Sequence, residues 1–163
     1  MKPLSINVKR ASVLVLLVIL VLSLSSCQIL ENPVISSLGT YSHRELYSEG
    51  AFQDFTDYGK YYFISANAAQ SMYFKQLQAS DLPVIHEHLN DFENWIEVFR
   101  STDASRKIVQ NYDFDRQIID MEDYIYIDSE THTWSDGHTS LVSYDLYFFD
   151  SQTLVLYYFH NNI

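Results

Sequence analysis

Residues 139–160, TSLVSYDLYFFDSQTLVLYYFH, decide the fold because apolar and aromatic side chains alternate with polar ones along most of this stretch. A period of two in segments rich in β-branched and aromatic residues is typical of β-strands. Asp150-Ser151-Gln152 interrupts the pattern with residues that favour turns. The stretch therefore predicts two strands, Thr139–Asp150 and 153–160, that pair as an antiparallel hairpin.

Further strands are predicted upstream of this hairpin. Residues 123–128, DYIYID, alternate in the same way, and Asp136-Gly137 supplies a turn before the next strand. Another strand is expected within residues 112–119. Together these segments predict an antiparallel β-meander of three or four strands.

Two helices are expected before the meander. The second is predicted over residues 81–100, where Asp81 can cap free amide groups, Pro83 is tolerated in the first turn and Arg100 suits the C-terminus. The first is predicted over residues 51–79, where one stripe recurs at steps of three and four: Phe52, Phe55, Gly59, Tyr62, Ala66, Ala69, Tyr73 and Leu77.

The short connection between these helices predicts an antiparallel helical hairpin. The expected fold class is α+β, with the helical hairpin packed on one face of a three- to four-stranded antiparallel β-meander. Aromatic residues make up 15 % of the chain, which favours a folded core over a disordered acidic tail. One globular domain is expected over residues 49–163.

The N-terminal residues have the pattern of an export signal. Lys2, Lys9 and Arg10 precede an apolar run over residues 11–24, and no acidic residue accompanies them. The run is shorter than the roughly 20 apolar residues that span a bilayer. A cleaved signal peptide over residues 1–26 is therefore favoured over a permanent transmembrane helix.

Leu24-Ser25-Ser26-Cys27 follows the apolar run and resembles the lipobox of bacterial lipoproteins. This resemblance implies cleavage before Cys27, acylation of its thiol and anchoring at the extracytoplasmic face of a membrane. Residues 27–48 are then expected to be the acylated N-terminus and a flexible tether. Residues 52–63, FQDFTDYGKYYF, also resemble uncharacterised Firmicute lipoproteins, a resemblance that implies no activity.

Composition excludes several classes of function. The formal net charge of −11 makes nucleic acid a poor partner. Because Cys27 is the single cysteine, the domain has no internal disulfide, no thiol nucleophile and no cysteine-ligated metal. The four scattered glycines form no phosphate-binding pattern. No cofactor and no metal are expected.

A binding surface is predicted on one face of the C-terminal hairpin. If Phe149 pairs with Leu154, alternation places Tyr144, Leu146, Phe148 and Phe159 on the face that helices cover. The opposite face then carries the candidate binding residues Asp145, Tyr147, Tyr158 and His160. Tyrosines among short polar residues are typical of surfaces that bind proteins or sugars.

A competing site lies in the loop between the predicted strands, THTWSDGHT. His132, Asp136 and His138 supply two imidazoles and a carboxylate, a set able to bind a metal ion or to act in acid/base catalysis. Asp136-Gly137 also fits an ordinary turn. The favoured function is a non-enzymatic, membrane-anchored domain with an envelope protein or carbohydrate partner, and the alternative is a small envelope enzyme or metal-binding protein that uses this loop.

Overall fold

A computed structural model describes residues 32–51 and 54–162, and the residues from Val34 on form one compact unit. The strands are β1 (Tyr41–Ala51), β2 (Asp54–Phe63), β3 (Lys75–Gln76), β4 (Tyr124–Thr133), β5 (Thr139–Asp150) and β6 (Val155–Asn162). The helices are α2 (Pro33–Ser36), α3 (Leu82–Thr102) and α4 (Lys107–Asn111), with single 3₁₀ turns η1 (Ala68–Gln70), η2 (Ala79–Asp81) and η3 (Arg116–Ile118).

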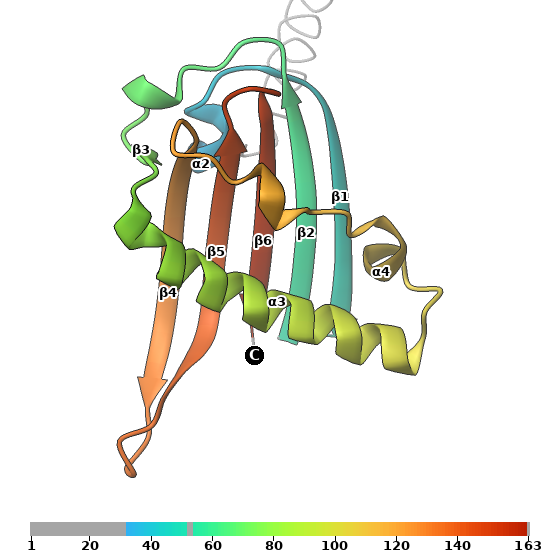
Figure 1. Cartoon of the computed structure of the whole chain (residues 1–163). Helices are drawn as coiled ribbons and strands as arrows, with labels where there is room; N and C mark the ends of the chain where they lie inside the picture. The colour runs from blue at the N-terminus through green and yellow to red at the C-terminus, as the bar shows by residue number, and fades with distance from the viewer. Residues whose placement is uncertain (1–31, 52–53, 163) are drawn as a thin grey trace, which may run out of the picture. The chain divides into compact units, whose positions relative to one another are not determined.

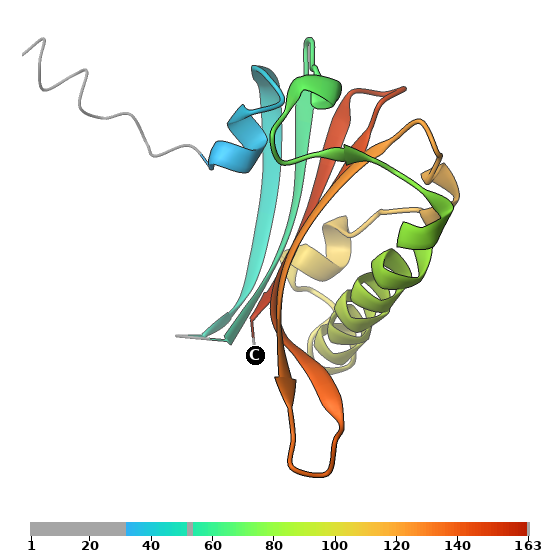
Figure 2. The ribbon, with the colours of Figure 1, turned by 90° about the vertical axis from the view of Figure 1, so that its left-hand side faces the viewer.

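These strands form one antiparallel sheet in the order β1-β2-β6-β5-β4-β3 (Figure 1). The sheet curves around α3, which crosses the face that we call the inner face (Figure 2). α3 buries one stripe against it: Ile85, Leu89, Phe92 and Ile96. The sheet contributes Tyr58, Tyr144, Leu146, Phe148 and Phe159 to the same core. Helix and sheet therefore share one aromatic-rich core.

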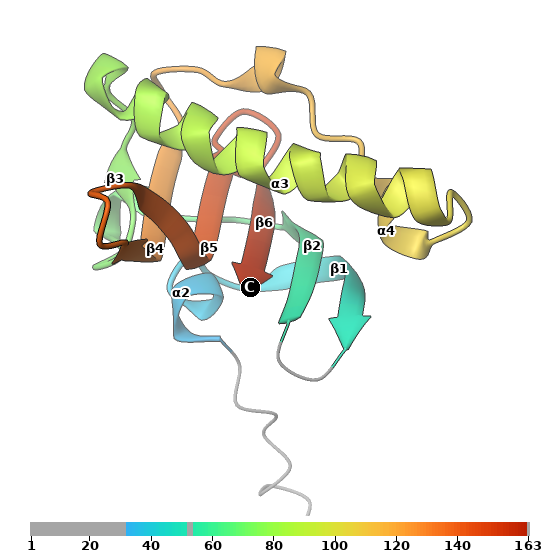
Figure 3. The same ribbon diagram turned by 90° about the horizontal axis from the view of Figure 1, so that it is seen from below.

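Within the described residues, only one end of the opposite, outer face is covered. There α2 and the connection from β2 to β3 supply Val34, Ile35, Leu38, Ala68 and Phe74. These side chains pack on Tyr61, Phe63, Tyr147, Phe149 and Leu156 of the sheet. Seen from below, α2 lies on one side of the sheet and α3 on the other (Figure 3). The remainder of the outer face carries the polar residues that form the candidate site.

The predicted fold class is wrong in its main feature. The sheet has six strands rather than three or four, and no helical hairpin packs on it. The predicted helix over residues 51–79 is instead the end of β1, the strand β2, an irregular connection with η1, and β3. The strand expected within residues 112–119 is also wrong, because η3 and irregular backbone occupy that segment.

The error over β2 has a physical reason. β2 buries Tyr58 and Lys60 on the inner face and Tyr61 and Phe63 on the outer face. A strand that is buried on both sides has no apolar and polar alternation, so its aromatic residues also match helical spacing. Gly59 allows close packing here, because a Cβ atom at this position would lie 3.1 Å from Leu46 Cδ1.

The folded part also extends into the predicted tether. α2 and most of β1 lie within residues 27–48, and β1 forms the edge of the sheet beside β2. β1 was missed because an edge strand with several charged residues resembles a linker in composition. The proposed signal peptide and Cys27 lie outside the described residues.

The strands predicted over residues 123–128, 139–150 and 153–160 are confirmed as β4, β5 and β6, and the helix expected over residues 81–100 is α3. The turn differs in detail, because Phe149 pairs with Leu156 and not with Leu154. A shift by two residues leaves every side chain on its predicted face. Tyr144, Leu146, Phe148 and Phe159 accordingly lie beneath α3.

Candidate functional site

A row of polar residues crosses the uncovered part of the outer face. Each residue is the cross-strand partner of the next, so their side chains share this face. In the order of the strands β1, β2, β6, β5 and β4, the row consists of Ser48, Asp57, His160, Asp145 and Asp128. Ser48 Oγ donates a hydrogen bond to Asp57 Oδ1. We call these five residues the polar row.

Asp145 is the centre of the hydrogen bonding in the row. Its Oδ1 accepts from Tyr158 Oη at 2.8 Å and pairs with His160 Nδ1, also at 2.8 Å. The Tyr158 ring stacks on Tyr147 with centroids 4.9 Å apart. Burial and, after it, the charge of Asp145 raise the pKa of Tyr158, so its phenol stays protonated and remains a donor. About a third of the Asp145 side chain is exposed to solvent.

The contact with Asp145 defines which nitrogen of His160 carries a proton. A carboxylate only accepts hydrogen bonds, so Nδ1 carries the hydrogen of this contact. Nε2 is buried and has no hydrogen-bond partner in the described part of the chain. The Phe55 ring lies against the imidazole, with centroids 4.7 Å apart.

A small hollow of about 190 Å³ adjoins Asp145 at the base of the β4–β5 hairpin. Three carboxylates line it, those of Asp128, Glu130 and Asp145, together with Ser129, Ser143 and Tyr144. The β4–β5 register shifts between Glu130 and Thr131, which opens the ladder at this place. The hollow and the row suit a cationic or hydrogen-bond-donating group.

The structure brings together three of the four predicted binding residues. Asp145, Tyr158 and His160 form the hydrogen-bonded cluster. Tyr147 shares their face but is only 2 % exposed, so the prediction that it lies on an open surface is wrong. The connection from β2 to β3 covers it, and the Phe74 ring centroid lies 6.5 Å away. Tyr147 supports Tyr158 from within the core.

Asp57 and Asp128 were not predicted as part of this cluster. Asp57 lies on β2, a segment that sequence periodicity assigned to a helix. The cross-strand pairing of Asp57 with His160 could therefore not be predicted. Asp128 marked the end of a predicted strand, and only the β4–β5 register reveals that it is the partner of Asp145.

The predicted site in the loop between β4 and β5 is not assembled. Asp136 Oδ1 accepts from the backbone N–H of His138, and Gly137 has φ +84°, both as a tight turn requires. The His132 ring packs edge-on against Trp134. Among residues 32–51 and 54–162 no three His, Asp or Glu side chains are grouped so as to hold a metal ion.

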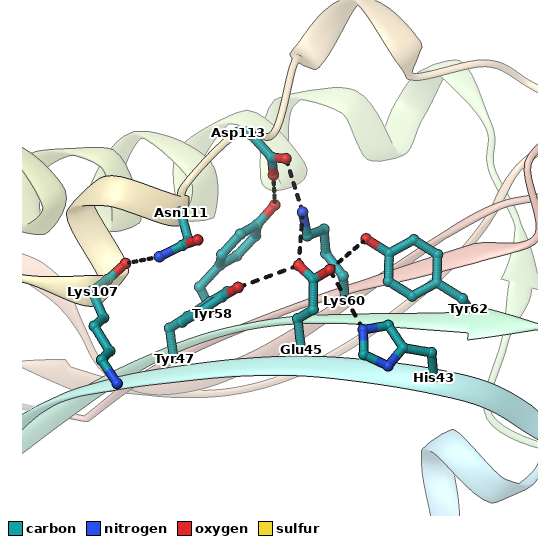
Figure 4. A network of polar contacts seen from close by, with 9 residues as sticks. All are labelled: His43, Glu45, Tyr47, Tyr58, Lys60, Tyr62, Lys107, Asn111 and Asp113. Atoms are coloured by element: carbon teal, nitrogen blue, oxygen red, sulfur yellow. Dashed lines mark hydrogen bonds and ion pairs between the residues drawn. The ribbon is translucent and has the colours of Figure 1, made fainter.

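A second polar cluster lies between β1, β2 and the segment after α4 (Figure 4). Lys60 Nζ is 2.8 Å from Asp113 Oδ2 and 3.1 Å from Glu45 Oε2. Tyr58 Oη donates to Asp113 Oδ1 at 2.7 Å, and Tyr62 Oη donates to Glu45 Oε1 at 3.2 Å. The lysine is thus enclosed by two carboxylates and the ring of a buried tyrosine.

The protonation state of Lys60 decides what this second cluster can do. Burial alone would lower the pKa of Lys60, but hydrogen bonds to Asp113 and Glu45 outweigh burial and raise it. A permanently protonated amine is neither a nucleophile nor a base. Lys60 therefore acts as an ion-pair partner, and its contacts link Asp113, in the segment after α4, to Glu45 on β1.

No protein-family model, no curated protein and no solved structure matches this chain. None of the helices formed by the described residues has the length and hydrophobicity that crossing a bilayer requires.

Proposed function

We propose that this protein is an extracytoplasmic lipoprotein whose acylated Cys27 anchors one binding domain to a membrane. The support for the anchor is the order of features at the N-terminus: basic residues, a short apolar run, and then Leu24-Ser25-Ser26-Cys27. Two or more acyl chains give stable anchoring, whereas a single chain binds a membrane only marginally.

Replacing Cys27 with alanine is expected to abolish the incorporation of labelled palmitate, because the thiol that accepts the lipid is gone. The measurement is metabolic labelling followed by electrophoresis, which also detects the longer unprocessed precursor. Ser101→Ala, at an exposed position of α3, is the control, because it keeps both Cys27 and the whole Leu24-Ser25-Ser26-Cys27 motif. Absence of label from the wild type would reject the lipid anchor.

For the domain itself we propose a non-enzymatic binding function, with an envelope protein or carbohydrate as partner. One observation carries this proposal: Asp145 and His160 form a connected cluster on the outer face with Tyr158, which packs at the border of the core formed with α2. An exposed carboxylate held in place by two neighbours is preorganised to accept hydrogen bonds from a partner. Aromatic rings beside it add contact area.

Asp145→Asn is the sharpest test of this site, because it removes the charge with little change of shape. Two quantities are measured: the capture of a partner from native-host membranes and the binding of the host's envelope polysaccharides. Binding is expected to fall at least about tenfold, because one charge-assisted hydrogen bond is lost. Asp115→Asn, at an exposed aspartate after α4, is expected to bind like the wild type. Equal capture by the two variants would exclude this face from binding.

A further inference from the structure

One end of the domain is built from two segments that are distant in the sequence. α2 and the residues after it lie beside the connection from β2 to β3, at the same end of the sheet (Figure 2). Asn67 N donates to Leu38 O at 3.0 Å, and Ser37 Oγ and Ser71 Oγ are 2.7 Å apart. We call residues 32–42 and 61–74 the uncharged end.

The name describes the charge distribution. Residues 32–42, NPVISSLGTYS, and 61–74, YYFISANAAQSMYF, contain no Asp, Glu, Lys, Arg or His, and they are the two longest such runs in the described part of the chain. The whole protein has 21 acidic residues and a net charge of −11. Three cations border these runs: Lys60 is buried, whereas Arg44 and Lys75 are exposed, and Lys75 Nζ lies 2.7 Å from Asp81 Oδ1. A strongly acidic protein therefore has two adjacent segments without charged side chains, and the acidic residues at the adjoining strand ends, Asp150 of β5 and Asp123 before β4, are buried.

The same end exposes large apolar side chains. Among the large hydrophobic residues of the described chain, the two most exposed are Met72 at 87 % and Ile64 at 73 %. Both lie in the connection from β2 to β3, next to a core formed with α2. Apolar side chains that project from an uncharged surface gain free energy when a hydrocarbon environment covers them.

The length of the N-terminal chain places this end near the proposed anchor. Six residues, 28–33, lie between Cys27 and Val34, where the compact unit begins, so seven Cα–Cα steps join them. A fully extended chain rises by at most about 3.6 Å per residue, so this linker spans no more than roughly 25 Å. The sequence predicted a longer tether that reached residue 48. Because β1 is part of the sheet, the linker is shorter than that tether and holds the domain closer to Cys27.

We propose that the uncharged end rests on the lipid bilayer to which Cys27 anchors the chain, with Ile64 and Met72 inserted among the head groups. This inference depends on the proposed acylation of Cys27. Arg44 then faces anionic head groups, and the ion pair between Lys75 and Asp81 adds no net negative charge at this border. The β4–β5 hairpin extends from the opposite end of the sheet, so the polar row and its hollow face the aqueous side (Figure 1).

Single-cysteine probes test this orientation, since Cys27 is the only native cysteine and acylation blocks its thiol. Ile64→Cys and Met72→Cys are labelled with an environment-sensitive fluorophore in the acylated protein, reconstituted into phosphatidylcholine–phosphatidylglycerol vesicles. Val98→Cys is the matched control, because Val98 is 48 % exposed on α3. A lipid-borne nitroxide is expected to quench the probes at positions 64 and 72 several-fold more than the probe at 98.

The outcomes separate this inference from the anchor. Protein that sediments with vesicles but shows equal, weak quenching at all three positions overturns the inference and leaves the anchor intact. Protein that does not sediment overturns both. A third outcome is that fluorescence at positions 64 and 72 changes with the density of protein on the vesicles but is not quenched by the nitroxide. This result would assign the uncharged end to contact with a second copy of the chain and would also overturn the inference.

Discussion

Phe92→Ala is expected to lower the free energy of unfolding by about 3–5 kcal/mol, the range for truncation of a buried phenylalanine. Phe92 lies on the buried stripe of α3 and has no exposed surface. Its ring contacts Tyr58, Tyr112 and Phe159, with centroids 6.3, 5.6 and 5.3 Å away. The substitution therefore leaves a cavity where helix, sheet and the segment after α4 meet.

Chemical denaturation of the purified protein measures this effect. Val98→Ala is the matched control on the same helix, because its side chain is exposed, and it is expected to change stability by less than about 0.5 kcal/mol. A Phe92→Ala variant as stable as the control would contradict the placement of α3 on the inner face.

The sequence predicted the elements whose two sides differ in environment. α3 has one buried and one exposed side, Pro83 lies in its first turn and Arg100 in its last. The predicted cap by Asp81 is wrong, because its carboxylate accepts from Gln78 N and Lys75 Nζ and makes no cap hydrogen bond to the helix. β5 and β6 alternate clearly enough that even a wrong turn pairing assigned their faces correctly. The sequence could not predict β2, which is buried on both faces, or β1, whose charged residues hide an edge strand.

The candidate site was predictable to the same extent. Alternation along β5 and β6 placed Asp145, Tyr158 and His160 on one face, and their hydrogen bonds follow from adjacent positions on paired strands. Burial of Tyr147 depends on Phe74 and on α2, which come from segments far away in the sequence. No periodicity within β5 carries information about that cover.

Lys60→Met is expected to destabilise the protein by about 2 kcal/mol near pH 7, because it leaves Glu45 and Asp113 without their counter-ion. Loss of one partner from a fully buried ion pair costs about 3–5 kcal/mol. The Lys60 side chain is 11 % exposed, but Glu45 and Asp113 are 28 % and 60 % exposed, so water compensates part of the loss. Methionine keeps most of the volume of the lysine stem, which limits any packing defect.

The loss of stability in the Lys60→Met variant is expected to depend on pH. Burial would raise the pKa of Asp113 and of Glu45, yet the contacts with Lys60 lower both below their ordinary values. A carboxylate with a lowered pKa stabilises the fold above its unfolded pKa of about 4, and this contribution is lost as pH falls through the folded pKa. The raised pKa of Lys60 keeps its own contribution in place up to about pH 10.

The difference in stability between wild type and Lys60→Met is therefore expected to be largest between about pH 5 and pH 10 and to shrink below about pH 4. Urea denaturation at a series of pH values measures it. Lys107→Met makes the same chemical change at an exposed lysine on the neighbouring α4 (Figure 4), and it should behave like the wild type at every pH. A difference that persists unchanged as the pH falls below the folded pKa values of both carboxylates would assign the loss to packing of the lysine stem. It would remove the ion pairs from the account of how β1, β2 and the segment after α4 are held together.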